Sequence, residues 1–141
     1  FRQRLTHWVQ PTKRTDLQLL RPDSAPDSAV GRPGFTLEEM AQIVLRLGED
    51  IGLKSPLARV VLVLGHGSSS LNNPHESAYN CGACGGGRGG PNARALASMA
   101  NRPEVRKRCR ALGYDIPDQT FFIGGYHNTC NDDVEFYDVE C

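Results

Sequence analysis

Two residue types that bind transition metals stand close together in a glycine-rich part of the sequence. His66 and Cys81 are fifteen positions apart, within residues 65–91, a stretch that carries eight glycines. A neutral imidazole and a thiolate are preferred ligands of Zn²⁺, which takes four donors, or three donors and a water molecule. Water bound to zinc ionises near neutral pH and becomes a nucleophile. The pattern indicates a zinc site, although a hydrogen-bonded loop histidine and a small buried cysteine would look the same.

Cys81 also belongs to a Cys-x-x-Cys pair with Cys84, typical of half a zinc ribbon or of a thioredoxin-like redox site. The second half of a ribbon is missing, because the other cysteines stand singly. A redox pair usually opens a helix directly, whereas glycines follow here. Five cysteines in all make a poor disulfide framework, which favours a reducing, cytoplasmic location.

The glycines of residues 85–90 surround Arg88 and precede a predicted helix. Successive backbone amides, a helix N-terminus and a guanidinium could bind a small oxyanion. The segment is no P-loop, since no Lys-Ser/Thr follows the last glycine. An equally good interpretation is that the glycines allow a close approach of two backbones.

Other polar groups give weaker signals. Serines 68–70 follow His66, but the Gly-x-Ser-x-Gly motif of serine hydrolases is absent. His127 and the residues 130–132 form a second polar cluster, which we interpret as a solvated turn. Cys109 lies in a basic helical stretch, residues 106–110, which we expect to be structural with a solvated face.

The predicted elements alternate in the manner of α/β proteins. A capping box of Thr36 and Glu39 opens a helix that ends at Gly52. Residues 60–64 are a continuous apolar, mostly β-branched run, which predicts a parallel strand buried on both faces. The loop 65–91 follows it, and open α/β sheets bind ligands at such strand ends.

Two further helices and two strands complete the prediction. One helix runs from Pro91 or Asn92 to about Ala100, and the next, capped by Asn101, runs from Pro103 to Gly113. Residues 120–123 form the second strand, which the glycines 124 and 125 break. Residues 134–139 alternate apolar and acidic side chains, as an edge strand does.

The amino-acid composition excludes some classes of binding partner. The 141 residues carry sixteen basic and sixteen acidic side chains, a formal net charge of zero, which argues against a nucleic-acid or anionic-lipid surface. The longest apolar run has five residues, far short of the ~20 that span a bilayer. Residues 1–34 contain four prolines and no hydrophobic period, which predicts a weakly ordered linker. The chain begins with Phe1, and we expect it to be a piece of a larger protein.

Several motifs together resemble the DabA family, soluble subunits of bacterial inorganic-carbon uptake systems. They are Phe-Thr-Leu-Glu-Glu-Met at 35–40, Gly-His-Gly-Ser-Ser-Ser-Leu-Asn-Asn-Pro at 65–74, Cys-Gly-Ala-Cys-Gly-Gly at 81–86, Ala-Ser-Met-Ala-Asn-Arg-Pro-Glu-Val-Arg at 97–106, and His-Asn-Thr-Cys at 127–130. The resemblance covers residues 34 to 139. It implies a partial β-carbonic-anhydrase-like fold, a three-layer sheet with flanking helices and a long glycine-rich loop. Residues 35–141 would be the C-terminal half of that zinc domain.

The resemblance also implies a ligand set. His66 and Cys81 match the later pair of zinc ligands, while an earlier Cys-x-Asp segment and its arginine partner would lie upstream of this chain. Cys130 and Asp132 have the Cys-x-Asp spelling but follow the His/Cys pair, so we do not assign them. Two protein ligands hold zinc poorly, and we expect the isolated chain to be inactive. Cys84 could serve as a substitute third ligand.

The function implied is hydration of CO₂ to bicarbonate at a zinc-bound hydroxide. The partner would be a proton-conducting, antiporter-like membrane subunit, with the protein peripheral on the cytoplasmic face. The alternative is a non-catalytic scaffold whose structural metal supports docking to the membrane subunit. A hydrolase that uses Ser68 is the weakest hypothesis.

Overall fold

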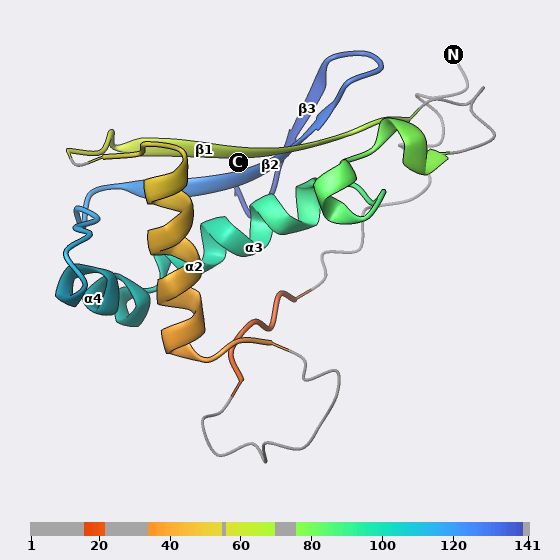
Figure 1. Cartoon of the computed structure of the whole chain (residues 1–141). Coiled ribbons are helices and arrows are strands. Elements are labelled where there is room, and N and C mark those ends of the chain that lie inside the picture. Colours follow the sequence, from red (N-terminus) through yellow and green to blue (C-terminus); the bar gives the residue numbers. More distant parts are fainter. Residues whose placement is uncertain (1–15, 22–33, 55, 70–75, 140–141) are drawn as a thin grey trace, which may run out of the picture.

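The computed structural model describes residues 16–21, 34–54, 56–69 and 76–139, and shows a mixed α/β fold (Figure 1). Three helices, α2 (Leu37–Asp50), α3 (Gly90–Asn101) and α4 (Pro103–Ala111), accompany three strands in this part of the chain. The strands are β1 (Val60–Gly67), β2 (Phe121–Asn128) and β3 (Asp133–Phe136). Two short 3₁₀ helices, η1 (Glu76–Tyr79) and η2 (Gly82–Cys84), lie between β1 and α3.

The sheet has the order β1-β2-β3, with β1 parallel to β2 and β3 antiparallel to β2. The parallel pair is in register over its whole length, from Val60 opposite Phe121 to Gly67 opposite Asn128. A parallel pair requires a crossover connection, which α3 and α4 provide. The predicted parallel strand is thus confirmed, and both strands extend further than the sequence indicated.

The helices lie on one face of the sheet, as Figure 1 shows for α2, α3 and α4. We call this the inner face. The core lies between it and the helices, and its buried side chains come from α2, α3, α4 and the segment before β2. They include Met40, Val105, Cys109 and Ile116. The structural role predicted for Cys109 fits this burial.

Helix α2 begins as predicted. Thr36 accepts a hydrogen bond from the Glu39 amide at 3.2 Å, and the Glu39 carboxylate accepts from the Thr36 amide at 2.7 Å. The Arg21 guanidinium donates to both oxygens of the same carboxylate, at 2.8 and 2.7 Å. Leu19 is buried beside α2. Part of the segment predicted as a linker therefore packs on the domain, while residues 1–15 and 22–33 lie outside the described residues.

Two expectations are wrong. Alternate residues of β1 are about half exposed, so this strand is not buried on both faces, because no described helix covers the outer side of the sheet. The described residues form two layers, and the three-layer sheet that the resemblance implies for the complete domain stays a prediction. Strand β3 ends at Phe136, short of Val139, because the backbone of Asp138 turns to φ 56°.

Two helix details also differ from the prediction. Arg102, not Asn101, precedes α4 as its N-cap. The Asn101 side chain instead makes two hydrogen bonds with the backbone of Phe122. Its Nδ2 donates to the Phe122 carbonyl at 2.7 Å, and its Oδ1 accepts from the Phe122 backbone amide at 2.9 Å. The side chain thus ties α3 to β2. No helix among the described residues is long and apolar enough to cross a membrane.

Candidate metal site at the ends of the parallel strands

The carboxyl ends of β1 and β2 bring two histidines together. His66 and His127 are register partners in the parallel pair, and paired residues of neighbouring strands project from the same face. Along β1 the exposed positions alternate with the covered ones, and His66 is exposed. Both imidazoles therefore belong to the outer face, opposite the helices. The sequence prediction had placed His127 in a separate cluster.

A turn after β2 orients His127. Its Nε2 lies 3.0 Å from Oδ1 of Asp132, a residue with the positive φ of 59°. A carboxylate on one ring nitrogen fixes the tautomer and leaves the other nitrogen for a further contact. Cys130, Asn131 and Asp132 are exposed, which agrees with the solvated turn predicted for them.

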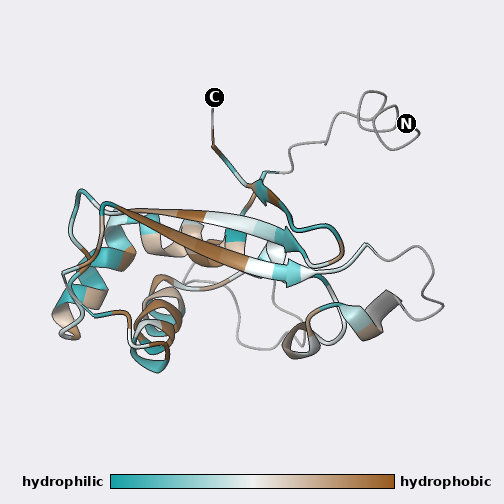
Figure 2. Cartoon of the chain, turned by 90° about the horizontal axis from the view of Figure 1, so that it is seen from above, coloured by the Kyte–Doolittle hydropathy of each residue, from teal (hydrophilic) through white to brown (hydrophobic). Residues whose placement is uncertain are grey.

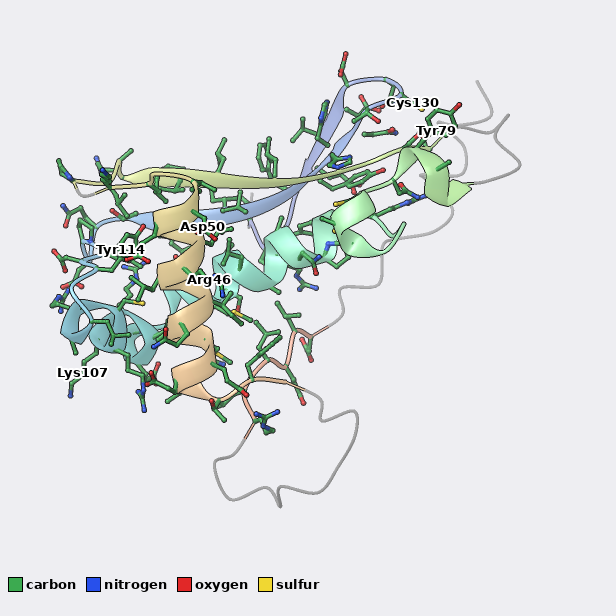
Figure 3. All side chains as sticks on the ribbon, in the orientation of Figure 1. Arg46, Asp50, Tyr79, Lys107, Tyr114 and Cys130 are labelled. Atoms are coloured by element: carbon green, nitrogen blue, oxygen red, sulfur yellow. The ribbon has the colours of Figure 1, made fainter. Side chains whose placement is uncertain are left out.

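The segment after β1 returns to the same strand end, as the prediction for Cys81 requires. The Ser68 amide donates to Oδ1 of Asn80 at 2.9 Å, and the Gly89 amide donates to the carbonyl of His66 at 2.8 Å. The residues before and after Cys81 are thereby tied to both sides of His66. Figure 3 shows the same gathering, with Tyr79 of η1 and Cys130 of the β2–β3 turn at one end of the molecule.

Cys81 opens a tight turn that ends at Gly87. The Cys81 amide donates to the Gly87 carbonyl at 3.0 Å, and the Cys81 carbonyl accepts from the amides of Cys84 and Gly86 at 3.0 and 3.1 Å. Gly85 has φ 65°, a left-handed conformation that favours glycine. The glycines after Cys84 thus close a turn, where a redox motif would continue as a helix.

The two thiols of this turn differ in acidity. The hydrogen bond from the Cys84 thiol is the main cause that lowers the pKa of Cys81, and the backbone amides of Cys84 and Ala83 add to it. The same contact raises the pKa of Cys84, although Asn92 donates to its sulfur at 3.2 Å. Cys81 is therefore the thiol that ionises first. A thiolate is the form that binds a metal.

The glycines at the strand end serve a close approach of two backbones. A Cβ atom on Gly65 would lie 2.1 Å from the carbonyl carbon and oxygen of Gly89. A Cβ atom on Gly90 would lie 2.4 Å from the Tyr137 hydroxyl. This packing brings the start of α3 against β1 and accounts for glycine at 65, 89 and 90.

The described residues do not complete a metal site by themselves. No group of three or more His, Cys, Asp and Glu side chains among them could hold a metal ion. The structure joins the segments of His66 and Cys81, and any further donors would have to come from outside the described residues.

Comparison with known proteins identifies the family. The family model described as "Probable inorganic carbon transporter subunit DabA" matches residues 1–141. The chain belongs to the DabA family. A relative in Rhodopirellula baltica, named probable inorganic carbon transporter subunit DabA 2, is 56% identical over 126 residues, which are 89% of this chain and 12% of the relative. A DabA relative in Methylococcus capsulatus is 43% identical over 142 residues, 96% of this chain and 13% of the relative.

The DabA-family chain thus spans about an eighth of the curated relatives it matches. No solved structure matches it. The predicted family is confirmed, whereas the β-carbonic-anhydrase-like fold and the zinc remain predictions.

Arg88 of this DabA-family chain stands over the ring of Tyr126, with its guanidinium carbon 5.8 Å from the ring centroid. Both line a cavity of about 320 Å³ together with Ser69 and Asn128. Asp133 and Glu135 line it too, so carboxylates offset the charge of the guanidinium. An anion-binding role for Arg88 stays a prediction.

Ser68 is engaged in the fold of the DabA-family chain. It is buried, and its Oγ lies 2.9 Å from Sγ of Cys130. The neighbouring Asn128 donates to Oγ of Ser69 at 2.7 Å and accepts from the Cys130 amide at 3.1 Å. This network joins the loop after β1 to the turn after β2, which is a structural role and gives no support to a serine nucleophile.

Proposed function

We propose that this chain supplies His66 and Cys81 to the zinc site of an inorganic-carbon transporter subunit. One observation carries the proposal. The Gly89 amide donates to the His66 carbonyl and the Ser68 amide donates to Asn80, so the backbone on both sides of Cys81 is anchored at the strand end that bears His66.

The donors present fit half of a zinc site. His66 offers an exposed imidazole, and Cys81 offers a thiol whose pKa is lowered by the Cys84 thiol and by backbone amides. The described residues contain no group of three or more His, Cys, Asp or Glu side chains that could hold a metal ion. By the family resemblance the remaining ligands would be a Cys-x-Asp segment elsewhere in the polypeptide.

When bound, zinc would supply the Lewis acid that lets water react near neutral pH, and the reaction would convert CO₂ to bicarbonate. This chain's own residues would act around it. Cys84 and the amides of the turn would hold Cys81 as a thiolate, and the Gly65–Gly89 contact would fix the loop. Arg88 or nearby amides would orient the oxyanion.

The transporter context suggests the partner. The relatives are named as transporter subunits, which supports a membrane subunit that completes the complex. We propose a proton-conducting, antiporter-like partner and a peripheral position on the cytoplasmic face of the membrane. Proton movement through that partner would make the hydration effectively one-way.

The test measures zinc content and inorganic-carbon-dependent growth for the full polypeptide expressed with its partner. His66→Ala and Cys81→Ser should each lose the bound zinc and the growth phenotype. The matched control is Cys130→Ser, an exposed cysteine at the same end of the molecule, which should retain both. If His66→Ala kept full zinc and full uptake, the proposal would be wrong.

One observation favours the scaffold as a second candidate. Cys84 contacts Cys81 in a closed turn, an arrangement that suits a structural metal. In that case Cys84→Ser would remove zinc as completely as Cys81→Ser does. Under the carbonic-anhydrase hypothesis Cys84→Ser keeps the zinc, because its thiol only donates to the Cys81 sulfur.

A further inference from the structure

A groove lies at the end of the sheet opposite the candidate metal site. It is lined by α4 and by the segment that enters β2, and its volume is about 770 Å³, within the range of small-molecule sites. The groove reaches Phe121, the first residue of β2, whereas His127 is close to the last. Figure 3 shows the same separation, with Lys107 of α4 at one end of the molecule and Cys130 at the other. We call this groove the α4 groove.

The charged side chains that line the α4 groove are mainly cations. Arg106, Lys107 and Arg110 come from α4, and Asp118 is the one carboxylate among the lining residues. Figure 2 shows the hydrophilic colour on much of α4. Arg110 contacts Asp115 at 2.8 Å and Asp118 at 3.5 Å. Lys107 is exposed, and no carboxylate in the described part of the chain pairs with it.

The Arg106 guanidinium is buried, and no carboxylate of the described residues is in contact with it. Its hydrogen bonds go to neutral oxygens, namely the side-chain oxygen of Asn101 and the carbonyls of Ala100, Pro117, Asp118 and Thr120. A buried charge is costly unless it is paired. Burial lowers the pKa of Arg106, attraction to the Asp118 carboxylate offsets part of this shift, and repulsion from Arg110 adds to it. An anion in the α4 groove would therefore stabilise both guanidinium groups.

We propose that the α4 groove binds a small molecule that carries a phosphate group. The lining has three cations against one carboxylate, and this excess matches the charge of about −1.5 to −2 that a phosphate monoester carries at pH 7. Bicarbonate and simple carboxylates carry a single charge and match the excess less well. The groove is also larger than a phosphate group, which leaves room for the organic part of the ligand.

Each cation has a distinct role in this proposal. Lys107 contacts the phosphate oxygens directly, because its exposed ammonium group is on a flexible stem. Arg110 joins it when the contact with Asp118 is broken, so Asp118 competes with the ligand. Arg106 contributes charge from the wall of the groove, since its N–H groups are already bonded to the fold. The ligand would bind without occupying the candidate metal site, so the inference goes beyond the proposed zinc function and does not depend on it.

The experiment titrates inorganic phosphate into the full polypeptide, produced with its partner subunit, by isothermal titration calorimetry. Lys107→Glu should weaken phosphate binding about tenfold or more, because a carboxylate replaces a cation beside the phosphate. Asp118→Asn should strengthen phosphate binding about threefold, because an exposed competing carboxylate is removed. The matched control is Arg46→Glu, the same change of charge at an exposed position of α2 outside the groove, which should change the affinity less than about twofold. Bicarbonate, titrated in place of phosphate, should bind about tenfold more weakly or less.

Several outcomes would overturn the proposal. An absence of phosphate binding would do so directly. Equal losses in Lys107→Glu and Arg46→Glu would mean a diffuse electrostatic attraction, and unchanged affinity in both Lys107→Glu and Asp118→Asn would mean that phosphate binds elsewhere. Bicarbonate binding as tight as that of phosphate would mean a site for inorganic carbon. His66→Ala separates this proposal from the proposed function, since it should lose zinc and keep phosphate binding, and a loss of phosphate binding in this variant would mean that phosphate binds at the metal.

Discussion

The close approach at Gly65 makes a sharp prediction for Gly65→Ala. The added Cβ would lie 2.1 Å from the carbonyl carbon and oxygen of Gly89 and 2.6 Å from the Gly90 nitrogen. These atoms are backbone at the start of α3, so no flexible side chain can move aside. To reach an ordinary contact of 3.4 Å, the two segments must separate by more than an ångström.

The magnitude follows from two losses. Overpacking a well-packed site costs about 1–3 kcal/mol. The separation also breaks the 2.8 Å bond from the Gly89 amide to the His66 carbonyl, worth about 1 kcal/mol. We expect a loss of about 3 kcal/mol in the free energy of unfolding, a large part of the ~5–15 kcal/mol of an ordinary domain.

Urea unfolding followed by far-ultraviolet circular dichroism measures this loss. The matched control is Gly82→Ala, in the same glycine-rich segment, because its Cβ would meet no atom within 4 Å and its φ is not positive. The control should change stability by less than about 0.5 kcal/mol. If the two variants unfolded at the same urea concentration, the packing argument for Gly65 would be refuted.

Three further predictions test other parts of the fold by the same unfolding assay. Arg106→Leu should lower the free energy of unfolding by about 3 kcal/mol, because the buried guanidinium donates to the carbonyls of Ala100 and Thr120 at 2.8 and 2.6 Å. The control Lys107→Ala, on the exposed side of the helix, should leave the free energy of unfolding nearly unchanged. Thr36→Ala should cost about 1 kcal/mol through loss of the α2 cap, and an unchanged midpoint would contradict the capping box. Burial raises the pKa of the Cys109 thiol above its ordinary value of 9.0. Above pH 9.0 the unfolded chain therefore releases a thiol proton that the folded chain keeps. The stability of the wild type should fall as the pH rises from 9.0 through the raised pKa of the folded state. Cys109→Ala lacks this thiol proton, so the difference in unfolding free energy between this variant and the wild type should become smaller as the pH rises above 9.0.

Local signals predicted the elements well. The capping box of Thr36 and Glu39 and the apolar run of β1 depend on neighbours in sequence, and both are present as expected. The sequence could not show that the strands continue. Gly124 was interpreted as a break in β2, but its missing Cβ lets α3 approach, since a Cβ there would lie 2.6 Å from the Arg94 Cα.

The proximity of the two histidines depends on tertiary structure and not on local sequence. His66 and His127 meet because β1 and β2 pair in parallel over eight positions, and no local pattern in either segment states that register. The extension of β2 through His127 was hidden by its two glycines. Both strand segments end with glycine followed closely by histidine, Gly65-His66 in one and Gly125-Tyr126-His127 in the other. This similarity indicates that the two histidines are neighbours only once the register of the strands is known.

The burial of Arg106 could not be predicted from the residues around it in the sequence. Its basic surroundings, residues 106–110, predicted a solvated helix face, yet its side chain is buried. It donates to carbonyls of the segment that enters β2, including that of Thr120, and to the side chain of Asn101 at 3.1 Å. Hydrogen-bonding capacity, and not charge, explains its position, because a guanidinium can satisfy several backbone acceptors that a short loop leaves unpaired.

The candidate site follows from how the backbone is used. The bonds that tie the returning loop to β1 use the His66 carbonyl and the Ser68 amide, and so leave the His66 imidazole and the Cys81 thiol outside those contacts. Glycine at 65 and 89 permits this because backbone can then pack on backbone. A chain that needed only a stable strand end could have filled this space with side chains, as cores normally are. The arrangement therefore costs packing at the strand end, and it keeps the His66 imidazole and the Cys81 thiol out of the contacts that fix the loop to β1, which is a property that a ligand pair requires.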